Sequence, residues 1–341
     1  MKIEIVDETK RKAWESFINE QPKAIAWQSY KWFDVLKKHY NIDFYPIVAF
    51  QGNEIRGILP LYNLKRSHNK NLLMSVPFAV AGGIVSTDAE SEMLLLDKAI
   101  ELAGDYDNSN ITFKQYKHKV TGPLSTDENY CNKELQLGAD LDKVWNQISE
   151  FNRQKVQEGK NYKYEVEHNS KNINEFYDFL FKYHQRKGIP CTSKSWIRDL
   201  VESGMYLITL LRFNGKVAAA TMVKEFKDTI SFPFSCTSDP DSEKFNLIYS
   251  LYWEIIKKYS LEGVNICHSG RLPKSGEADQ FRQGWGGTQY NYYYQYYPQT
   301  IQKTEYKVKR GSKRQMFEKV WKMTPQFVTK VVGPLIVRRF P

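Results

Sequence analysis

The chain has 341 residues, of which 41% are hydrophobic and 14% aromatic, a composition that excludes a largely disordered protein and fits one or two folded domains. No stretch approaches ~18 uninterrupted apolar residues, so no membrane-spanning helix is expected. The N-terminal sequence MKIEIVDETKRK lacks the apolar core of a signal peptide, which predicts a cytoplasmic protein. Four widely spaced cysteines predict reduced, buried thiols rather than disulfides or a zinc site: Cys131, Cys191, Cys236 and Cys267.

The first half of the chain alternates between helical and extended patterns. Periodicity and turn residues predict, in order, a helix at 27–40, strands at 46–50 and 54–64 joined by a turn at Gly52, an extended run at 72–76, a small-residue loop at 79–83, a helix at 92–103 and a strand at 110–113. The helices would cover a sheet built from these strands.

The second half repeats this order without detectable sequence identity. It predicts a helix at 173–186, strands at 205–213 and 216–224 joined by Asn214-Gly215, a strand at 229–235, a helix at 246–259 and a strand at 264–267. The repetition predicts an α/β protein with two domains in tandem, each with a mixed sheet, and a boundary near residues 138–145.

The last 41 residues carry nearly all of the net charge. Residues 301–341 hold eleven Lys or Arg and two acids, in a chain whose net charge is +10. Apolar residues recur there at three- and four-residue steps, and Pro325 and Gly333-Pro334 are expected to break the pattern into short helices. Such a segment can lie on an anionic membrane, hold RNA phosphates, or dock on the protein body with its charges solvated. The pattern leaves these alternatives open.

Residues 263–287 predict a ligand site. The strand at 264–267 ends in Ser269-Gly270-Arg271, and after a polar loop Phe281-Arg282 precedes Trp285-Gly286-Gly287. Loops at the ends of buried strands commonly hold ligands, and arginine forks bind phosphate or carboxylate. Glycines at such a place let a backbone approach a ligand closely.

This segment resembles the "D-F-G-R … F-K-x-x-W/F-G" signature of the Fem-type aminoacyl transferases, which belong to the broader GNAT-like acyltransferases. Four further segments, collinear over roughly residues 25–290, are similar to motifs of that family: residues 27–32, 73–83, 152–155 and 215–219. The resemblance implies tandem GNAT-like acyltransferase domains. We therefore expect an N-terminal domain at 1–140, a C-terminal domain at 141–300 that carries the SGR and FRxGWGG motifs, and a basic amphipathic tail at 301–341.

The resemblance also implies an activity and a set of site residues. Family members transfer an aminoacyl group to an amine of a cell-wall peptide precursor, which here would be a peptidoglycan-like peptide or a surface glycan. Arg282 would assist transfer. His268 replaces the family's Asp, and because imidazole titrates near physiological pH it is a candidate general base, with a packing or hydrogen-bonding role at the strand end as the alternative. The substrate would be held between the two domains by Lys37, Arg186, Arg271, Ser75, Gly82, Gly83 and Trp285.

The expected donor follows from the segment before the helix at 246–259. CoA-dependent GNAT enzymes cradle the CoA pyrophosphate on a glycine-rich turn there, whereas residues 239–246 contain three acids and no glycine. This favours aminoacyl-tRNA over acyl-CoA as donor substrate, and no bound cofactor or metal is predicted. Two alternatives remain, namely a CoA-dependent N-acyltransferase of exopolysaccharide amino sugars and a non-catalytic scaffold that binds membrane or RNA. The expected partners are a lipid- or sugar-linked envelope precursor, tRNA, and the inner face of the cell membrane through residues 301–341, but not DNA.

Overall fold

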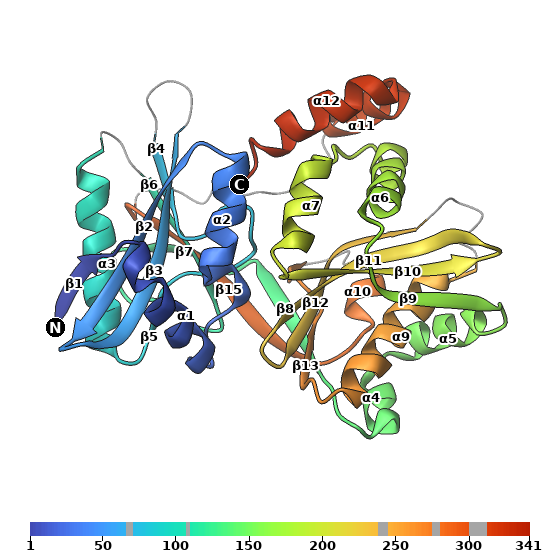
Figure 1. The fold of residues 1–341 in the computed structure, drawn as a ribbon, viewed down its shortest axis with the longest axis horizontal. Coiled ribbons are helices and arrows are strands. Elements are labelled where there is room, and N and C mark those ends of the chain that lie inside the picture. The colour runs from blue at the N-terminus through green and yellow to red at the C-terminus, as the bar shows by residue number, and fades with distance from the viewer. Residues whose placement is uncertain (66–70, 107–109, 238–244, 275–279, 300–311) are drawn as a thin grey trace. The chain divides into compact units, whose positions relative to one another are not determined.

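The computed structural model describes residues 1–65, 71–106, 110–237, 245–274, 280–299 and 312–341 (Figure 1). The chain forms two compact units. Unit 1 comprises Met1–Cys131, Pro273–Ser275 and Tyr290–Tyr306, and unit 2 comprises Asn132–Leu272, Gly276–Gln289 and Lys307–Pro341. Residues 290–306 thus belong with unit 1, whereas the division drawn from the sequence leaves them at the end of the second domain and in the tail.

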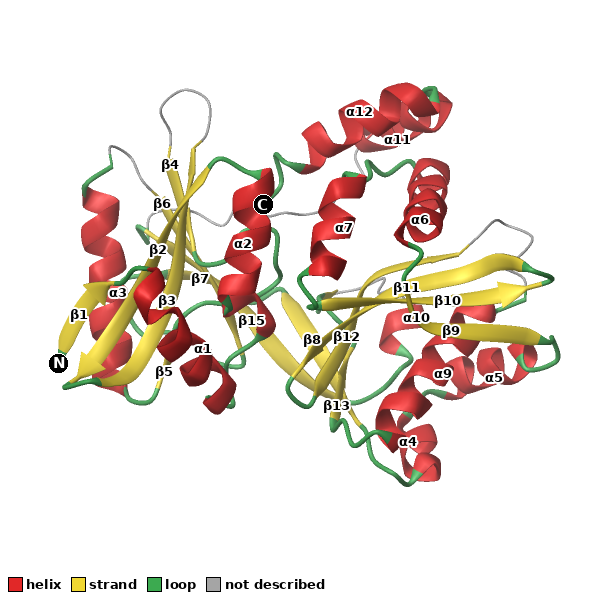
Figure 2. Cartoon of the chain, viewed as in Figure 1, coloured by secondary structure: helices red, strands yellow, loops and turns green. Residues whose placement is uncertain are grey.

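Unit 1 is a mixed sheet with helices on both faces (Figure 2). Its strands follow the order β1 (Lys2–Ile5), β2 (Ile42–Gln51), β3 (Glu54–Lys65), β4 (Asn71–Met74), β6 (Asn110–Tyr116) and β15 (Thr288–Tyr297), with β5 (Val85–Ser86) beside β3 and β7 (Ser125–Asp127) beside β15. Of these pairs, β4 and β6 run parallel and the others antiparallel. The helical segments are η1 (Glu8–Lys10), α1 (Arg11–Glu20), η2 (Ala26–Gln28), α2 (Tyr30–His39) and α3 (Ala89–Gly104).

Strand β2 shows why both faces of the unit 1 sheet are covered. Its side chains alternate: Ile47 and Ala49 belong to the cluster built on α3, whereas Val48 and Phe50 pack with residues of α1 and α2. All four are buried. A strand that is apolar on both faces needs a helical layer on each side.

Unit 2 is built on the same plan. Its strands follow the order β8 (Tyr130–Gln136), β13 (Ile266–His268), β12 (Thr229–Thr237), β11 (Lys216–Phe226), β10 (Tyr206–Phe213) and β9 (Tyr164–Ser170). Of these pairs, β12 and β13 run parallel and the others antiparallel. The remaining elements are α4 (Leu141–Gln147), α5 (Glu150–Gly159), α6 (Ile173–Lys187), α7 (Lys194–Glu202), α9 (Leu247–Leu261), β14 (Leu272–Pro273), α10 (Gln280–Gln283), α11 (Ser312–Met323) and α12 (Gln326–Val337).

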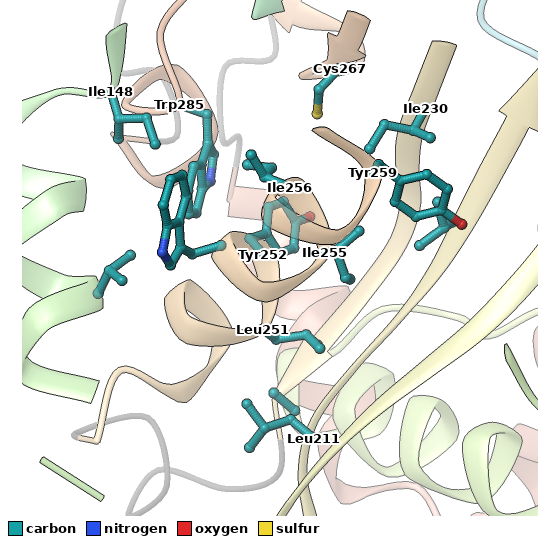
Figure 3. Close-up of a cluster of buried hydrophobic side chains, with 14 of the residues drawn as sticks. Ile148, Leu211, Ile230, Leu251, Tyr252, Ile255, Ile256, Tyr259, Cys267 and Trp285 are labelled. Carbon is teal, nitrogen blue, oxygen red and sulfur yellow. The ribbon is translucent and has the colours of Figure 1, made fainter. Parts of the chain in front are cut away.

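Helix α9 forms the centre of the unit 2 core. Leu251, Ile255 and Tyr259 recur every four residues and are buried together with sheet residues such as Leu211 and Ile230 (Figure 3). Helix α5 packs on α9, while α6 and α7 contact strands β10, β11 and β12 from the opposite face of the sheet (Figure 1). The predicted α/β class is therefore confirmed, with mixed parallel and antiparallel strand pairing in each unit.

Local turn chemistry explains the two central hairpins. Asn214 and Gly215 both adopt positive φ, at 51° and 74°, as a two-residue hairpin turn requires, and Gly52 has φ 61°.

The expectation that Gly333-Pro334 would end a helix is wrong, because α12 continues through Pro334. The neighbouring Gly333 is buried against the rest of unit 2, where a Cβ would lie 2.9 Å from the Cys191 carbonyl oxygen, so tertiary packing holds this part of α12 in place. The acidic segment 239–246 lies largely outside the described residues.

No helix in the described part of the chain is both long and apolar enough to cross a membrane.

Candidate functional site

A pocket lies in unit 2 where two parallel strands part. Strand β13 pairs with β12 only over Thr229–Ser231 and ends at His268, whereas β12 continues to Thr237. The pocket has a volume of about 270 Å³, counted out to its solvent opening, and is referred to below as the strand-end pocket. It is lined by Lys133, Leu135, Phe232, Tyr252, Cys267, His268, Ser269, Arg282, Trp285 and Gly286. The ends of strands in open α/β sheets are common positions for ligands.

His268 stands beside a buried carboxylate. His268 and Glu134 are register partners on β13 and β8, and His268 Nε2 lies 3.2 Å from Glu134 Oε1. The Glu134 side chain is only 2% exposed. The two groups are not aligned as a hydrogen bond, but the carboxylate lies close enough to attract a positive charge on the imidazole. The pair therefore suits a histidine that takes up a proton during a reaction.

The pair belongs to a polar row that crosses four strands. In register, Lys224 on β11 faces Ser231 on β12, Ser231 faces His268, and His268 faces Glu134. Register partners point to the same side of a sheet, so these side chains share one face. Lys224 is fully buried, and burial lowers its pKa to about 7. The sequence motif contains only His268 of this row. Lys224, Ser231 and Glu134 are recognisable as its neighbours only from the strand pairing.

The loop after His268 is fixed by backbone contacts. Ser269 N donates to Lys133 O at 3.0 Å, and Lys133 N donates to Ser269 Oγ at 2.9 Å. Gly270 N donates to the fully buried Asn132 at 3.0 Å. Ser269 therefore anchors the loop that follows β13.

The glycines of the second motif serve packing. Gly286 has φ 78°, and a Cβ there would lie 2.0 Å from Gln147 O, while one at Gly287 would lie 2.3 Å from Glu134 O. A Cβ at Gly284 would meet Asn152 at 2.3 Å. The close approach expected at these positions is thus made to neighbouring protein atoms.

Arg282 brings a permanent positive charge to the pocket. It lies half-buried on α10, and its Nη1 donates to the carbonyl oxygen of exposed Arg271 at 3.2 Å. Lys133 Nζ donates to Gln283 O at 3.3 Å. Two cationic side chains therefore line the strand-end pocket on the side formed by α10.

Trp285 forms part of the pocket wall. Its ring is buried and stacks on Tyr252 with centroids 5.4 Å apart (Figure 3). Among the described residues, its Nε1 has no hydrogen-bond partner. A buried indole N–H without an acceptor suits a polar ligand atom.

The remaining predicted residues lie elsewhere. Ser75 is fully buried in unit 1, where its Oγ accepts from Lys114 N at 3.0 Å and its own N donates to Thr112 O at 3.0 Å, which ties β4 to β6. Lys37 is exposed on the last turn of α2, and its Nζ lies 5.6 Å from the ring centroid of Phe33.

Gly82 and Gly83 line a second pocket, of about 350 Å³ counted out to solvent and formed within unit 1. Polar side chains from three other segments share it, namely Gln28, Gln115 and His118.

Arg186 lies in the last turn of α6 in unit 2, where its guanidinium carbon is 5.5 Å from the ring centroid of Tyr183. The structure thus brings His268, Arg282 and Trp285 together around one pocket of unit 2, whereas exposed Arg271 is outside the lining and contacts Arg282 through its carbonyl oxygen. Gly82 and Gly83 meet at a different pocket in unit 1, and the predicted roles of all of these residues stay predictions.

Burial disfavours a nucleophilic role for the thiol of the strand-end pocket. Cys267 is fully buried, and burial raises its pKa to about 12, so the reactive thiolate is scarce. The described residues contain no cluster of three or more His, Cys, Asp or Glu that could hold a metal ion.

Comparison with known proteins relates this chain to acyltransferases. Residues 147–291 match the family model of the acetyltransferase (GNAT) domain. No curated protein sequence is significantly similar to the chain.

Three solved structures illustrate the similarity of fold. FemX has a TM-score of 0.67 at 12% identity, over 85% of this chain and 97% of FemX. L-PGS from Bacillus licheniformis has a TM-score of 0.57 at 12% identity, over 97% of this chain and 99% of that one. A tandem GNAT protein from the clavulanic acid biosynthesis pathway has a TM-score of 0.52 at 11% identity, over 86% and 98% of the two chains. The chain therefore shares the fold of FemX, L-PGS and the tandem GNAT protein, and its residues 147–291 are similar to the acetyltransferase (GNAT) domain.

Proposed function

We propose that this protein transfers an acyl group, with aminoacyl-tRNA as the favoured donor, to an amine of a cell-envelope precursor. The strand-end pocket carries the proposal. Its lining includes an apolar wall, His268 and the cations Lys133 and Arg282, and Glu134 lies beside His268 on the neighbouring strand. Acyl transfer to an amine needs these three elements, because the donor must be held, a proton removed and a developing negative charge stabilised.

The chemistry assigns a role to each group. The neutral amine attacks the carbonyl carbon of the donor ester, which forms the new C–N bond and places a negative charge on the carbonyl oxygen. Arg282 and Lys133 stabilise that oxyanion. His268 accepts the proton that the amine loses, and Glu134 stabilises the resulting imidazolium. The C–O bond of the ester then breaks, and the proton passes to the leaving hydroxyl of the donor.

The start of α9 supports a donor other than CoA. Asn246, which caps this helix, donates through Nδ2 to Glu158 Oε2 at 2.7 Å, and Lys155 Nζ lies 2.8 Å from the same oxygen. A carboxylate paired with Lys155 thus contacts the N-cap residue of α9, and residues 239–246 before this helix contain no glycine that could cradle a pyrophosphate.

The acceptor class rests on the similar folds. FemX and L-PGS share the fold, as does the C-terminal domain of a putative lysylphosphatidylglycerol synthetase from Agrobacterium fabrum, with a TM-score of 0.53 at 9% identity. The last name denotes an amino acid joined to a lipid headgroup, which supports an aminoacyl donor and an envelope acceptor. We propose that the reaction takes place in the cytoplasm at the inner face of the membrane, with Lys37 of unit 1 and Arg186 of unit 2 as candidate substrate-binding residues.

A second candidate function is CoA-dependent N-acylation of an amino sugar in a surface polysaccharide. The match of residues 147–291 to the acetyltransferase (GNAT) domain favours this alternative.

A donor competition distinguishes the two candidates. Purified protein is incubated with radiolabelled aminoacyl-tRNA or acetyl-CoA, together with either a lipid-linked peptidoglycan precursor or a de-N-acetylated polysaccharide. We expect label from aminoacyl-tRNA to appear in the peptide precursor and to decrease in Arg282→Ala but not in Arg198→Ala, a change at an exposed arginine of α7. Label from acetyl-CoA in the sugar would instead establish the second candidate, and transfer from neither donor would favour a scaffold.

A further inference from the structure

The C-terminal helices α11 and α12 are fixed to unit 2 through one side. Trp321 is buried, and Gln185 Nε2 on α6 donates to the carbonyl oxygens of Trp321 at 2.8 Å and Thr324 at 3.0 Å. Thr329 Oγ1 donates back to Gln185 Oε1 at 2.7 Å. A Cβ at Gly188 would lie 2.8 Å from Glu318 O, so the backbones meet closely. The pair of helices is therefore a folded part of unit 2.

The outer side of the same helices is apolar and exposed. On α12, Phe327, Val331 and Leu335 recur every four residues and are 74%, 67% and 58% exposed. The eight exposed apolar residues of this surface, called here the C-terminal face, are Met316, Phe317, Val320, Met323, Phe327, Val331, Leu335 and Phe340. Exposed apolar side chains that repeat along a docked helix in this way indicate a binding surface.

Positive charges surround the C-terminal face. Residues 315–341 contain five Lys or Arg and a single acid, Glu318. The five cations are exposed: Lys319, Lys322, Lys330, Arg338 and Arg339. Lys330 Nζ also lies 5.1 Å from the ring centroid of Phe181, next to the docked side of α12.

We propose that the C-terminal face binds the surface of an anionic lipid bilayer. An amphipathic helix lies in a bilayer interface with its apolar side chains below the headgroups and its Lys and Arg beside lipid phosphates, and this surface offers both in one place. Charge complementarity selects an anionic bilayer over a protein partner, because an apolar protein surface would not need the five cations. The inference is independent of the transferase reaction. It goes beyond a basic tail because it names the residues that contact the lipid and the helices, docked on unit 2, that carry these residues.

The test is co-sedimentation of the full-length protein with vesicles of phosphatidylcholine alone or mixed equally with phosphatidylglycerol. We expect binding to the anionic vesicles that weakens in high salt. The triple variant Phe327→Ser, Val331→Ser, Leu335→Ser should bind about tenfold or more weakly at any salt concentration, since burial of its apolar side chains is lost. The triple variant Lys319→Gln, Lys322→Gln, Arg339→Gln should lose the salt dependence and about tenfold in affinity.

A matched control changes exposed apolar residues elsewhere. Met93→Ser with Leu261→Ser, at positions 54% and 64% exposed, should leave vesicle binding unchanged. Equal binding to neutral and anionic vesicles, or unchanged binding by both triple variants, would overturn the inference. Binding of tRNA in place of vesicles would also overturn the inference. The same holds for a dimer that forms without lipid and dissociates when Phe327, Val331 and Leu335 are replaced by serine. Circular dichroism shows whether the variants are folded. Acyl transfer to a water-soluble acceptor measures the proposed function separately from vesicle binding.

Discussion

Replacement of Arg282 by alanine should abolish most of the activity with little effect on stability. In the structure its Nη1 donates to Arg271 O at 3.2 Å from a half-buried position. Loss of such a bond costs about 1 kcal/mol of the free energy of unfolding, which lowers the melting temperature by roughly 4 °C or less. A charged contact made in the transition state contributes about 1.5–3 kcal/mol, so kcat/KM should decrease by roughly 10- to 150-fold.

The assay measures initial rates of label transfer and thermal unfolding for the same preparations. Arg282→Lys keeps the charge but not the planar fork, so it should retain an intermediate rate. Arg198→Ala, on the exposed side of α7, serves as the matched control and should leave both quantities unchanged. The reasoning is refuted if Arg282→Ala changes kcat/KM by less than about threefold, or if activity decreases only in proportion to a large loss of folded protein.

Three further outcomes follow from the environment of the pocket. Gly286→Ala should destabilise the protein much more than Gly270→Ala. Both residues have positive φ, but only at Gly286 would a Cβ collide with the backbone, 2.0 Å from Gln147 O. Equal melting temperatures of the two variants would contradict this prediction. Burial lowers the pKa of Lys224 to about 7, below that of the unfolded chain, so the unfolded state binds more protons between about pH 7 and 10. The free energy of unfolding should therefore rise with pH across this window, and urea titrations of Lys224→Met should show a smaller rise. Cys267, whose pKa burial raises to about 12, should react with iodoacetamide only in urea, as mass spectrometry of the labelled peptide would show.

Local patterns predicted the elements that depend on neighbouring residues. Leu251, Ile255 and Tyr259 predicted α9, and Asn214-Gly215 predicted the β10–β11 hairpin, because helical periodicity and turn geometry are set within a few residues. The motif around Arg282 likewise predicted a loop that the structure places beside a pocket.

The parts that escaped prediction depend on distant pairing. Glu134 and Lys224 join His268 only through the order of β8, β13, β12 and β11 in the sheet. The segment before Glu134 does carry a signal, since Asn132 and Glu134 are polar at alternate positions of a strand and both are buried. Pro334 was misjudged because the packing of Gly333 on Cys191, which holds α12 together, is a tertiary contact.

The return of residues 290–306 to unit 1 has a consequence for biosynthesis. Strand β6 pairs with β15, and Val120 N donates to Gln295 Oε1, a residue 175 positions later in the chain. At translation rates of about 5–20 residues per second, the ribosome needs roughly 10–35 s to supply that partner. During this interval the nascent first unit has an open sheet edge at β6, which is a template for pairing with other chains. The nascent chain is therefore most exposed to aggregation, and most dependent on chaperones, before β15 leaves the exit tunnel.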